Sequence, residues 1–216
     1  MNIAKLRDPI SSITHLIGGV LSILALLSLI LKQVIIGNIH VSLFVSTIIF
    51  GTSMILLYFT SGIYHAISAS KEKAVLIMKK VDHSMIYILI AGSYSPFCLY
   101  VLPKSTGIPV FIILWVIAIL GITMKILWIN MPRKLSSTMY IAMGWVAIFV
   151  IKDLYINLAP GAFFLLVLGG ILYTIGGLIY AIKRPNLKVW NFHDIFHIFI
   201  MLGSLAHFLL VFLFLI

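Results

Sequence analysis

Cysteine and acidic residues are both scarce in this chain. Cys98 is the single cysteine, so no disulfide can form within the chain, and it gives no indication of a redox compartment. Only 5 of the 216 residues are Asp or Glu, and charged residues make up 9%. A soluble domain usually has about 25%. The composition therefore argues against a water-soluble protein.

The basic residues invite a nucleic-acid interpretation, because 15 Lys and Arg give a formal net charge of +10. They lie between hydrophobic runs, however, and leave no basic and aromatic surface that could follow a phosphate backbone. Hydrophobic residues make up 62% of the chain, and its mean hydropathy is +1.21. We therefore expect an integral membrane protein with the lipid bilayer as its surroundings and no nucleic acid as a partner.

Seven hydrophobic runs are long enough to cross a bilayer. They cover residues 13–31, 41–67, 83–102, 108–128, 138–151, 160–182 and 193–216. The first run lacks a small-residue cleavage site, so we expect it to be a retained span. There is no internal repeat and no long linker. The expected fold is an all-α membrane protein with seven transmembrane helices, forming a single domain over residues 1–216.

The basic residues also predict the orientation of the chain. A cytoplasmic N-terminus places only Lys32, Lys104 and Lys152 outside, and the other twelve of the 15 basic residues inside. This agrees with the rule that cytoplasmic loops are rich in Lys and Arg. We expect a multi-pass protein of the inner (plasma) membrane, with its C-terminus outside.

Proline and glycine mark breaks and contacts in these helices. Pro96 lies inside the third run and should kink that helix, because proline lacks a backbone N–H. The pairs Gly169-Gly170 and Gly176-Gly177 in the sixth run are expected at close helix contacts.

Several ionisable and polar residues fall at the ends of the runs expected on the cytoplasmic side. His193 and His197 open the last run, four residues apart, and thus share one face of a helix. His65 ends the second run, Ser61 lies one turn deeper on the same face, and Asp82 precedes the third run. The expected orientation brings these groups to one depth of the bilayer.

Three imidazoles and a water form a familiar catalytic zinc set with one open position. We therefore predict Zn²⁺ bound by His65, His193 and His197. Asp82 could take the proton of the water. The Ser61 hydroxyl could donate to the scissile carbonyl. The predicted reaction is the hydrolysis of a membrane lipid amide or ester.

Three blocks of sequence give the chain a family resemblance. They are the segment from Asp8 through His15 to Gly18, the Ser61-x3-His65 element with Asp82 seventeen residues later (82 − 65), and His193-x3-His197. Together they resemble the hemolysin III family, the bacterial branch of the progestin and adipoQ receptor proteins, which is related to the alkaline ceramidases.

The resemblance implies seven helices and zinc at the three histidines, with Asp82 beside the zinc water and Ser61 beside the site. In receptors of the family it implies ceramide-type amide hydrolysis, while bacterial members are associated with haemolysis and membrane homeostasis. One position departs from the pattern, since Ser11 stands where the family has Asn.

Several residues have simpler interpretations. Asp82 could be a helix N-cap, and Ser61 could bond back to its own helix. We expect His15, His40 and His83 to be interfacial. His207 lies too deep to share the metal and is expected to be packed or hydrogen bonded, and Asp194 is expected to be solvated or to support the site.

Two other functions remain open. One is a non-enzymatic sensor or receptor of membrane homeostasis, or a haemolysin-like protein, in which zinc is structural. The other is a haem-binding helix bundle, since His193 and His207 lie fourteen residues apart on one helix (207 − 193). The lipid substrate, the oligomeric state and any protein partner are not indicated by the sequence.

Overall fold

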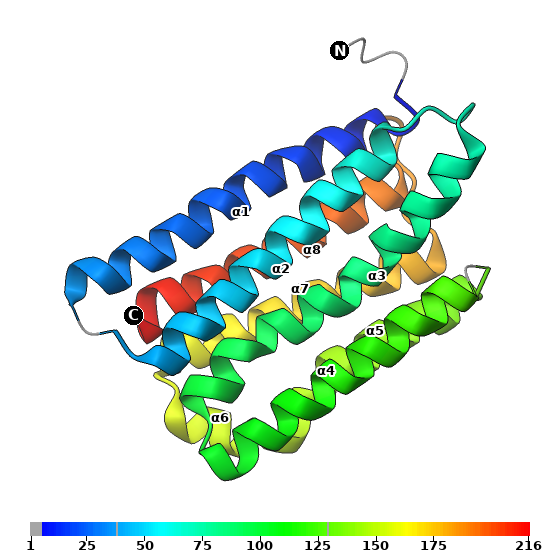
Figure 1. Ribbon diagram of the computed structural model, residues 1–216. Coiled ribbons are helices and arrows are strands. Elements are labelled where there is room, and N and C mark those ends of the chain that lie inside the picture. The colour runs from blue at the N-terminus through cyan, green and yellow to red at the C-terminus, as the bar shows by residue number, and fades with distance from the viewer. Residues whose placement is uncertain (1–5, 38, 129) are drawn as a thin grey trace.

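The structure is a computed structural model that describes residues 6–37, 39–128 and 130–216. Within these residues it is a bundle of long helices without strands (Figure 1). The α-helices are α1 (Pro9–Ile36), α2 (Val41–Ala66), α3 (Glu72–Pro96), α4 (Lys104–Leu127), α5 (Arg133–Gly144), α6 (Ile151–Asn157), α7 (Pro160–Ile182) and α8 (Phe192–Leu210).

Seven of the resulting segments are long and apolar enough to cross a membrane, which confirms the predicted number. Three of them combine helices of different type. The π-helix η2 (Phe97–Val101) continues α3, and the π-helix η4 (Val211–Leu215) continues α8. The 3-10 helix η3 (Trp145–Val150) joins α5 to α6 in a single span.

The bounds predicted for two spans were wrong. The third span begins at Glu72 instead of residue 83, and the fifth covers Arg133–Asn157 instead of 138–151. The first turns of α3 contain Lys73, Lys79 and Lys80, so hydropathy misses a helix that continues beyond its apolar part. Asp82 therefore lies within α3 and is not an N-cap.

Pro96 interrupts the third span as predicted. The regular α-helix α3 ends at this residue, and the π-helix η2 follows it. The missing N–H of a proline removes one hydrogen bond of the helical ladder. In transmembrane helices a local π segment can re-satisfy backbone groups that a proline leaves free.

Small residues let the helices approach closely. A Cβ at Gly62 of α2 would lie 2.8 Å from Leu16 of α1, and a Cβ at Gly169 of α7 would lie 2.4 Å from His207 of α8. Gly170 was also predicted at a helix contact, and this was wrong, because a Cβ there would meet no atom within 4 Å. Its side lies against open space.

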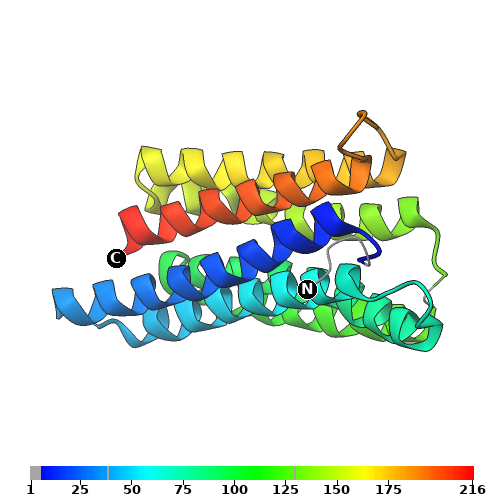
Figure 2. The ribbon, with the colours of Figure 1, turned by 90° about the horizontal axis from the view of Figure 1, so that it is seen from above.

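The position of α8 determines where the site forms. Seen from above, α8 lies between α1 on one side and α7 on the other (Figure 2), and it contacts both. The first turns of α8 thus meet the beginning of α1 and the end of α2, far apart in the sequence. The predicted site residues belong to these segments.

Candidate metal centre

Three buried or partly buried imidazoles meet at the start of α8. His65 comes from the last turn of α2, and His193 and His197 come from the first two turns of α8. Each offers one ring nitrogen, and these atoms lie within 4.8 Å of one another. The Nε2 atoms of His65 and His193 are 3.2 Å apart. The group could hold a metal ion.

A capping box fixes the beginning of α8. The Asn191 side chain accepts from the backbone N–H groups of His193 and Asp194, and the Asp194 carboxylate accepts from the Asn191 N–H. These bonds satisfy N–H groups that a helix start would leave unpaired. Because α8 begins at a fixed residue, His193 and His197 project from fixed turns toward α2.

Asp194 also attaches α8 to α1. Ser11 Oγ donates to Asp194 Oδ1 over 2.6 Å, and both residues are buried. Asp194 was expected to be solvated or to support the site, and its burial excludes the solvated alternative. Ser11 thus supplies a bond from α1 to the start of α8.

Asp8 holds the His65 ring. Its Oδ2 lies 2.9 Å from His65 Nδ1, and since a carboxylate can only accept, Nδ1 carries the hydrogen. His65 Nε2 is then left with its lone pair free for a metal. Carboxylates commonly orient metal-binding histidines in this way. Sequence analysis missed this role, although the acidic position in the first block was the available signal.

The Asp8 carboxyl is ionised over the whole neutral range. The hydrogen bond from His65, together with Arg7, lowers its pKa from the ordinary value of 3.8 to about 2. Its contribution to stability is therefore present above the unfolded pKa and is lost as the pH falls through about 2. The negative charge that faces His65 thus persists at any pH suited to metal binding.

His15 was expected at the membrane interface, and this was wrong. It is 3% exposed, and its ring stacks on that of His197 with centroids 3.5 Å apart and planes inclined by 9°. α8 lies against α1 at this level, so the N-terminal end of α1 is covered by protein on this side. His15 thus restricts the orientation of the His197 ring.

The nitrogen atoms of the cluster suit a metal ion. His197 Nδ1 is buried and has no hydrogen-bond partner among the described residues. His65 Nε2 has a free lone pair, as described above, and faces His193 Nε2. Three histidine nitrogens with a fourth position left open form a donor set typical of catalytic zinc.

Asp82 and Ser61, the predicted catalytic residues, lie beside this cluster in one cavity. They are 8% and 3% exposed, and both line a cavity of about 230 Å³ that also touches His193 and His197. The fold therefore brings both residues to the cavity, Asp82 from the interior of α3 and Ser61 from the turn of α2 before His65. Their catalytic roles remain predictions.

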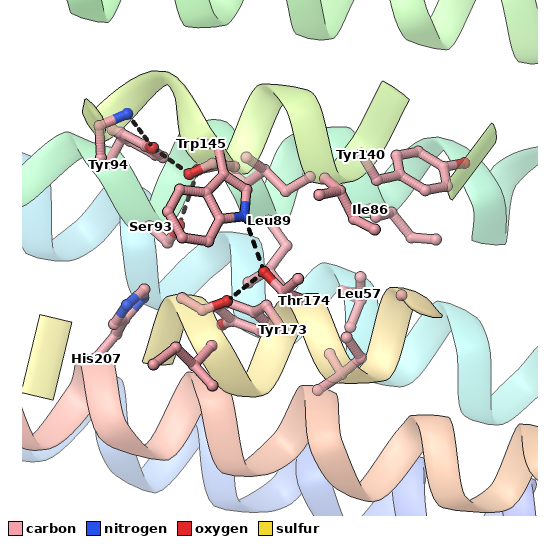
Figure 3. Close-up of a pocket in the computed structure, with 18 of the residues that line it drawn as sticks. Leu57, Ile86, Leu89, Ser93, Tyr94, Tyr140, Trp145, Tyr173, Thr174 and His207 are labelled. Atoms are coloured by element: carbon pink, nitrogen blue, oxygen red, sulfur yellow. Dashed lines mark hydrogen bonds between the residues drawn. The ribbon is translucent and has the colours of Figure 1, made fainter. Parts of the chain in front are cut away.

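The residues that line the cavity extend from the cluster to His207, and Figure 3 draws the part of the cavity between Tyr140 and His207. Its walls are mainly apolar, with Leu57, Ile86 and Leu89 among the lining residues. Along its wall Trp145 Nε1 donates to Thr174 Oγ1 over 3.0 Å, between η3 and α7. The cavity therefore offers a mainly apolar space with the histidine cluster at one end.

The remaining histidines differ in their surroundings. His83 was expected at the interface, but it lines the cavity. His40, by contrast, is exposed directly before α2, as expected. His207 Nε2 lies 3.3 Å from the Leu166 carbonyl, to which it donates, so it is packed and hydrogen bonded as predicted.

Seven apolar spans around a buried cluster of three histidines define a class of multi-pass membrane protein. A family model described as "Haemolysin-III related" matches residues 3–208. The chain belongs to this family, and its place in a bacterium is the plasma membrane.

Three relatives illustrate the range of the similarity. The "Hemolysin-3 homolog" of Bacillus subtilis (strain 168) is 42% identical over 201 residues, covering 93% of this chain and 91% of the relative. "Hemolysin-3" of Bacillus cereus is 41% identical over 202 residues, covering 93% and 88%. An "Adiponectin receptor protein" of Drosophila melanogaster is 25% identical over 164 residues, covering 67% of this chain and 37% of that protein. The last similarity relates the chain distantly to the progestin and adipoQ receptor group.

Proposed function

We propose that this protein is a zinc-dependent membrane hydrolase that acts on a lipid amide or ester. The observation that supports it most is the position of the histidine cluster at one end of an apolar cavity. Such a cavity suits an acyl chain, and the cluster at its end would then lie beside the carbonyl of that chain. His65, His193 and His197 would hold the ion.

A zinc ion held by three histidines would polarise the carbonyl of the substrate and lower the pKa of a bound water. The residues of the chain would supply the rest. Asp82 would accept a proton at its carboxylate. Ser61 would donate its hydroxyl hydrogen toward the carbonyl oxygen. Asp8 and His15 would keep the His65 and His197 rings in position without touching the substrate.

The shape of the cavity supports a lipid substrate. Lining residues on α7 and around η3 are well exposed, with Trp145 at 47%, Ile148 at 56% and Ile171 at 44%. Gly144 and Gly170 also line it, and a Cβ at either would meet no atom within 4 Å. An opening between α5 and α7 would let a lipid arrive directly from the bilayer.

Metal analysis and lipidomics test the proposal together. The purified full-length protein should contain about one zinc per chain. Membranes incubated with it should lose one lipid class and gain the matching fatty acid, whereas those incubated with His197→Ala should not. Protein without metal, or lipid profiles that are the same for both proteins, would refute the hydrolase.

The second candidate is a non-enzymatic sensor or receptor of membrane homeostasis, or a haemolysin-like protein, with structural zinc. The names of the three relatives, two hemolysins and a receptor, support this candidate. A structural zinc site is usually closed by four protein ligands. A spectroscopic count of the ligands would decide, because four protein ligands and no water would favour the second candidate.

A further inference from the structure

Ser137 of α5 differs from other buried serines of this bundle. Six of them return their hydroxyl to a carbonyl three or four residues earlier in the same helix, namely Ser22, Ser46, Ser53, Ser84, Ser93 and Ser95. Ser137 is 2% exposed, and its Oγ has no hydrogen-bond partner among the described residues. Its side chain lines the cavity. The hydroxyl is thus free for a group inside the cavity.

His83 of α3 has the same property on the same part of the wall. Its Nδ1 is buried without a partner in the described part of the chain, and its side chain lines the cavity. Tyr140, one turn after Ser137, donates to the His83 carbonyl over 3.0 Å, so α3 and α5 touch here. Two unpartnered polar side chains from two helices are unusual, because buried polar groups are nearly always hydrogen bonded.

Three cations lie around His83, and Asp82 is a carboxylate that lines the same cavity. The permanent charges that act on His83 belong to Lys125, Lys79 and Arg133. Within the described residues the ion pairs involve Asp8 with Arg7 and His65, so none of these three cations has a carboxylate partner. Lys125 is 2% exposed, donates to the Ser136 hydroxyl and lies over the Tyr140 ring. Arg133 is partly buried with its guanidinium over the rings of Tyr180 and Phe192, and its Nη1 has no hydrogen-bond partner among the described residues.

A buried cation without a carboxylate partner, as Lys125 is, is costly, and an anion bound nearby would relieve that cost. A hydroxyl and an imidazole N–H both donate hydrogen bonds, and donors beside cations suit the oxygens of a phosphate. The wall also lies within the first two turns of α5, where the helix dipole favours negative charge.

We propose that His83 and Ser137 form a headgroup subsite for the phosphate of an anionic lipid. In the proposed hydrolase, on which this inference rests, the substrate would then be a phospholipid, with its phosphate on the α3–α5 wall and its acyl chain in the apolar part of the cavity. Lys125 and Arg133 supply positive charge near His83.

Binding measurements test the subsite without requiring hydrolysis. Isothermal titration calorimetry of the full-length protein in a non-ionic detergent would compare a short-chain phosphatidic acid with the diacylglycerol of the same chains. The wild type should bind the phosphatidic acid about tenfold more tightly. Ser137→Ala and His83→Phe should each reduce this preference about tenfold, near the lower end of the effect of one lost hydrogen bond to a charged group. Diacylglycerol binding should not change.

Ser84→Ala is the matched control. Ser84 is a buried serine directly after His83, but its hydroxyl bonds to the Lys80 carbonyl and it does not line the cavity. This variant should retain the full preference, and Ser137→Thr should restore it because it keeps a hydroxyl. Equal binding of the two lipids by the wild type would overturn the subsite, as would an unchanged preference in both Ser137→Ala and His83→Phe.

Inorganic phosphate distinguishes the two sources of the anion. If it displaces phosphatidic acid, the subsite recognises phosphate itself, and if it does not, recognition requires the lipid; the subsite stands in both cases. Metal content measured on the same samples separates the two proposals. A phosphate preference in a protein without metal overturns the hydrolase and not the subsite, whereas zinc and hydrolysis without the preference overturn only the subsite.

Discussion

His197 and His207 lie on the same helix and are both buried, yet their surroundings differ completely. They are ten residues apart on α8 (207 − 197), or about 15 Å along its axis. His197 meets the rings of His15, His65 and His193, whereas His207 meets Phe97 and Tyr173. Burial of an imidazole therefore does not make a metal site; the approach of further imidazoles from other helices does.

The two levels of α8 are also held in place differently. Carboxylates support the level of His197, where Asp8 holds His65 and Asp194 caps α8. Hydroxyls support the deeper level, where Ser204 bonds both Tyr58 and Tyr173. Charged groups are expensive in the interior of a bilayer, so they occur near its surface. The candidate metal centre lies at the level where these carboxylates are found.

Replacing His197 and His207 one at a time gives the largest expected difference. His197→Ala removes one of three donor nitrogens, so the purified protein should lose its stoichiometric metal by elemental analysis. His207→Phe should keep it, because this ring lies about 15 Å away. Loss of metal from His207→Phe and its retention in His197→Ala would reverse the assignment.

The role of Asp8 is tested by a smaller change at the same end. Asp8→Ala should weaken metal binding about 10- to 100-fold, as the loss of a carboxylate behind a metal-binding histidine usually does. Competition with a chromophoric chelator measures the affinity. Glu72→Ala, an exposed carboxylate at the start of α3, is the control and should bind as the wild type does. Equal affinities for both variants would show that Asp8 does not orient His65.

Gly169 and Gly170, two neighbouring glycines of α7, test the level of His207. In Gly169→Ala the new Cβ would lie 2.4 Å from Nε2 and Cδ2 of His207, so the ring must move, at a cost of about 1–3 kcal/mol. The thermal midpoint should fall while the metal content stays the same. Gly170→Ala adds its methyl group to open space and should leave the midpoint unchanged. A loss of metal in Gly169→Ala would contradict the independence of the two ends.

The smallest expected effect concerns the attachment of α8 to α1. Ser11→Ala removes one of the hydrogen bonds to the Asp194 carboxylate and should destabilise the protein by about 1 kcal/mol. Ser11→Asn should restore part of this, because its side-chain amide can donate to the same oxygen. Thermal unfolding measures both. A Ser11→Ala protein as stable as the wild type would show that the capping box alone fixes the start of α8.

Much of the site could be predicted from the sequence, because the spacing of residues on a helix fixes which of them share a face. His193 and His197 follow from that spacing, and the alternation of spans brings His65 to their level. The role of Asp8 and the burial of His15 could not be predicted. Both depend on the lateral position of α1 against α2 and α8, which hydropathy does not encode.

The beginning of α3 shows the same limit. Hydropathy placed Asp82 at the start of a helix. α3 in fact begins ten residues earlier (82 − 72), at Glu72, and its first turns contain lysines, so hydropathy does not detect them. The free hydroxyl of Ser137 was also invisible, since its sequence neighbours do not reveal whether a serine bonds to its own helix or faces a cavity.

The sequence by itself determined the class of protein, the number of spans and the three histidines, because these follow from local composition and from periodicity along one helix. Only the tertiary structure decided which rings stack, which carboxylates support them and where the cavity lies. These features arise from contacts between helices that are distant in the chain, and the packing of many side chains at once sets the distances between them.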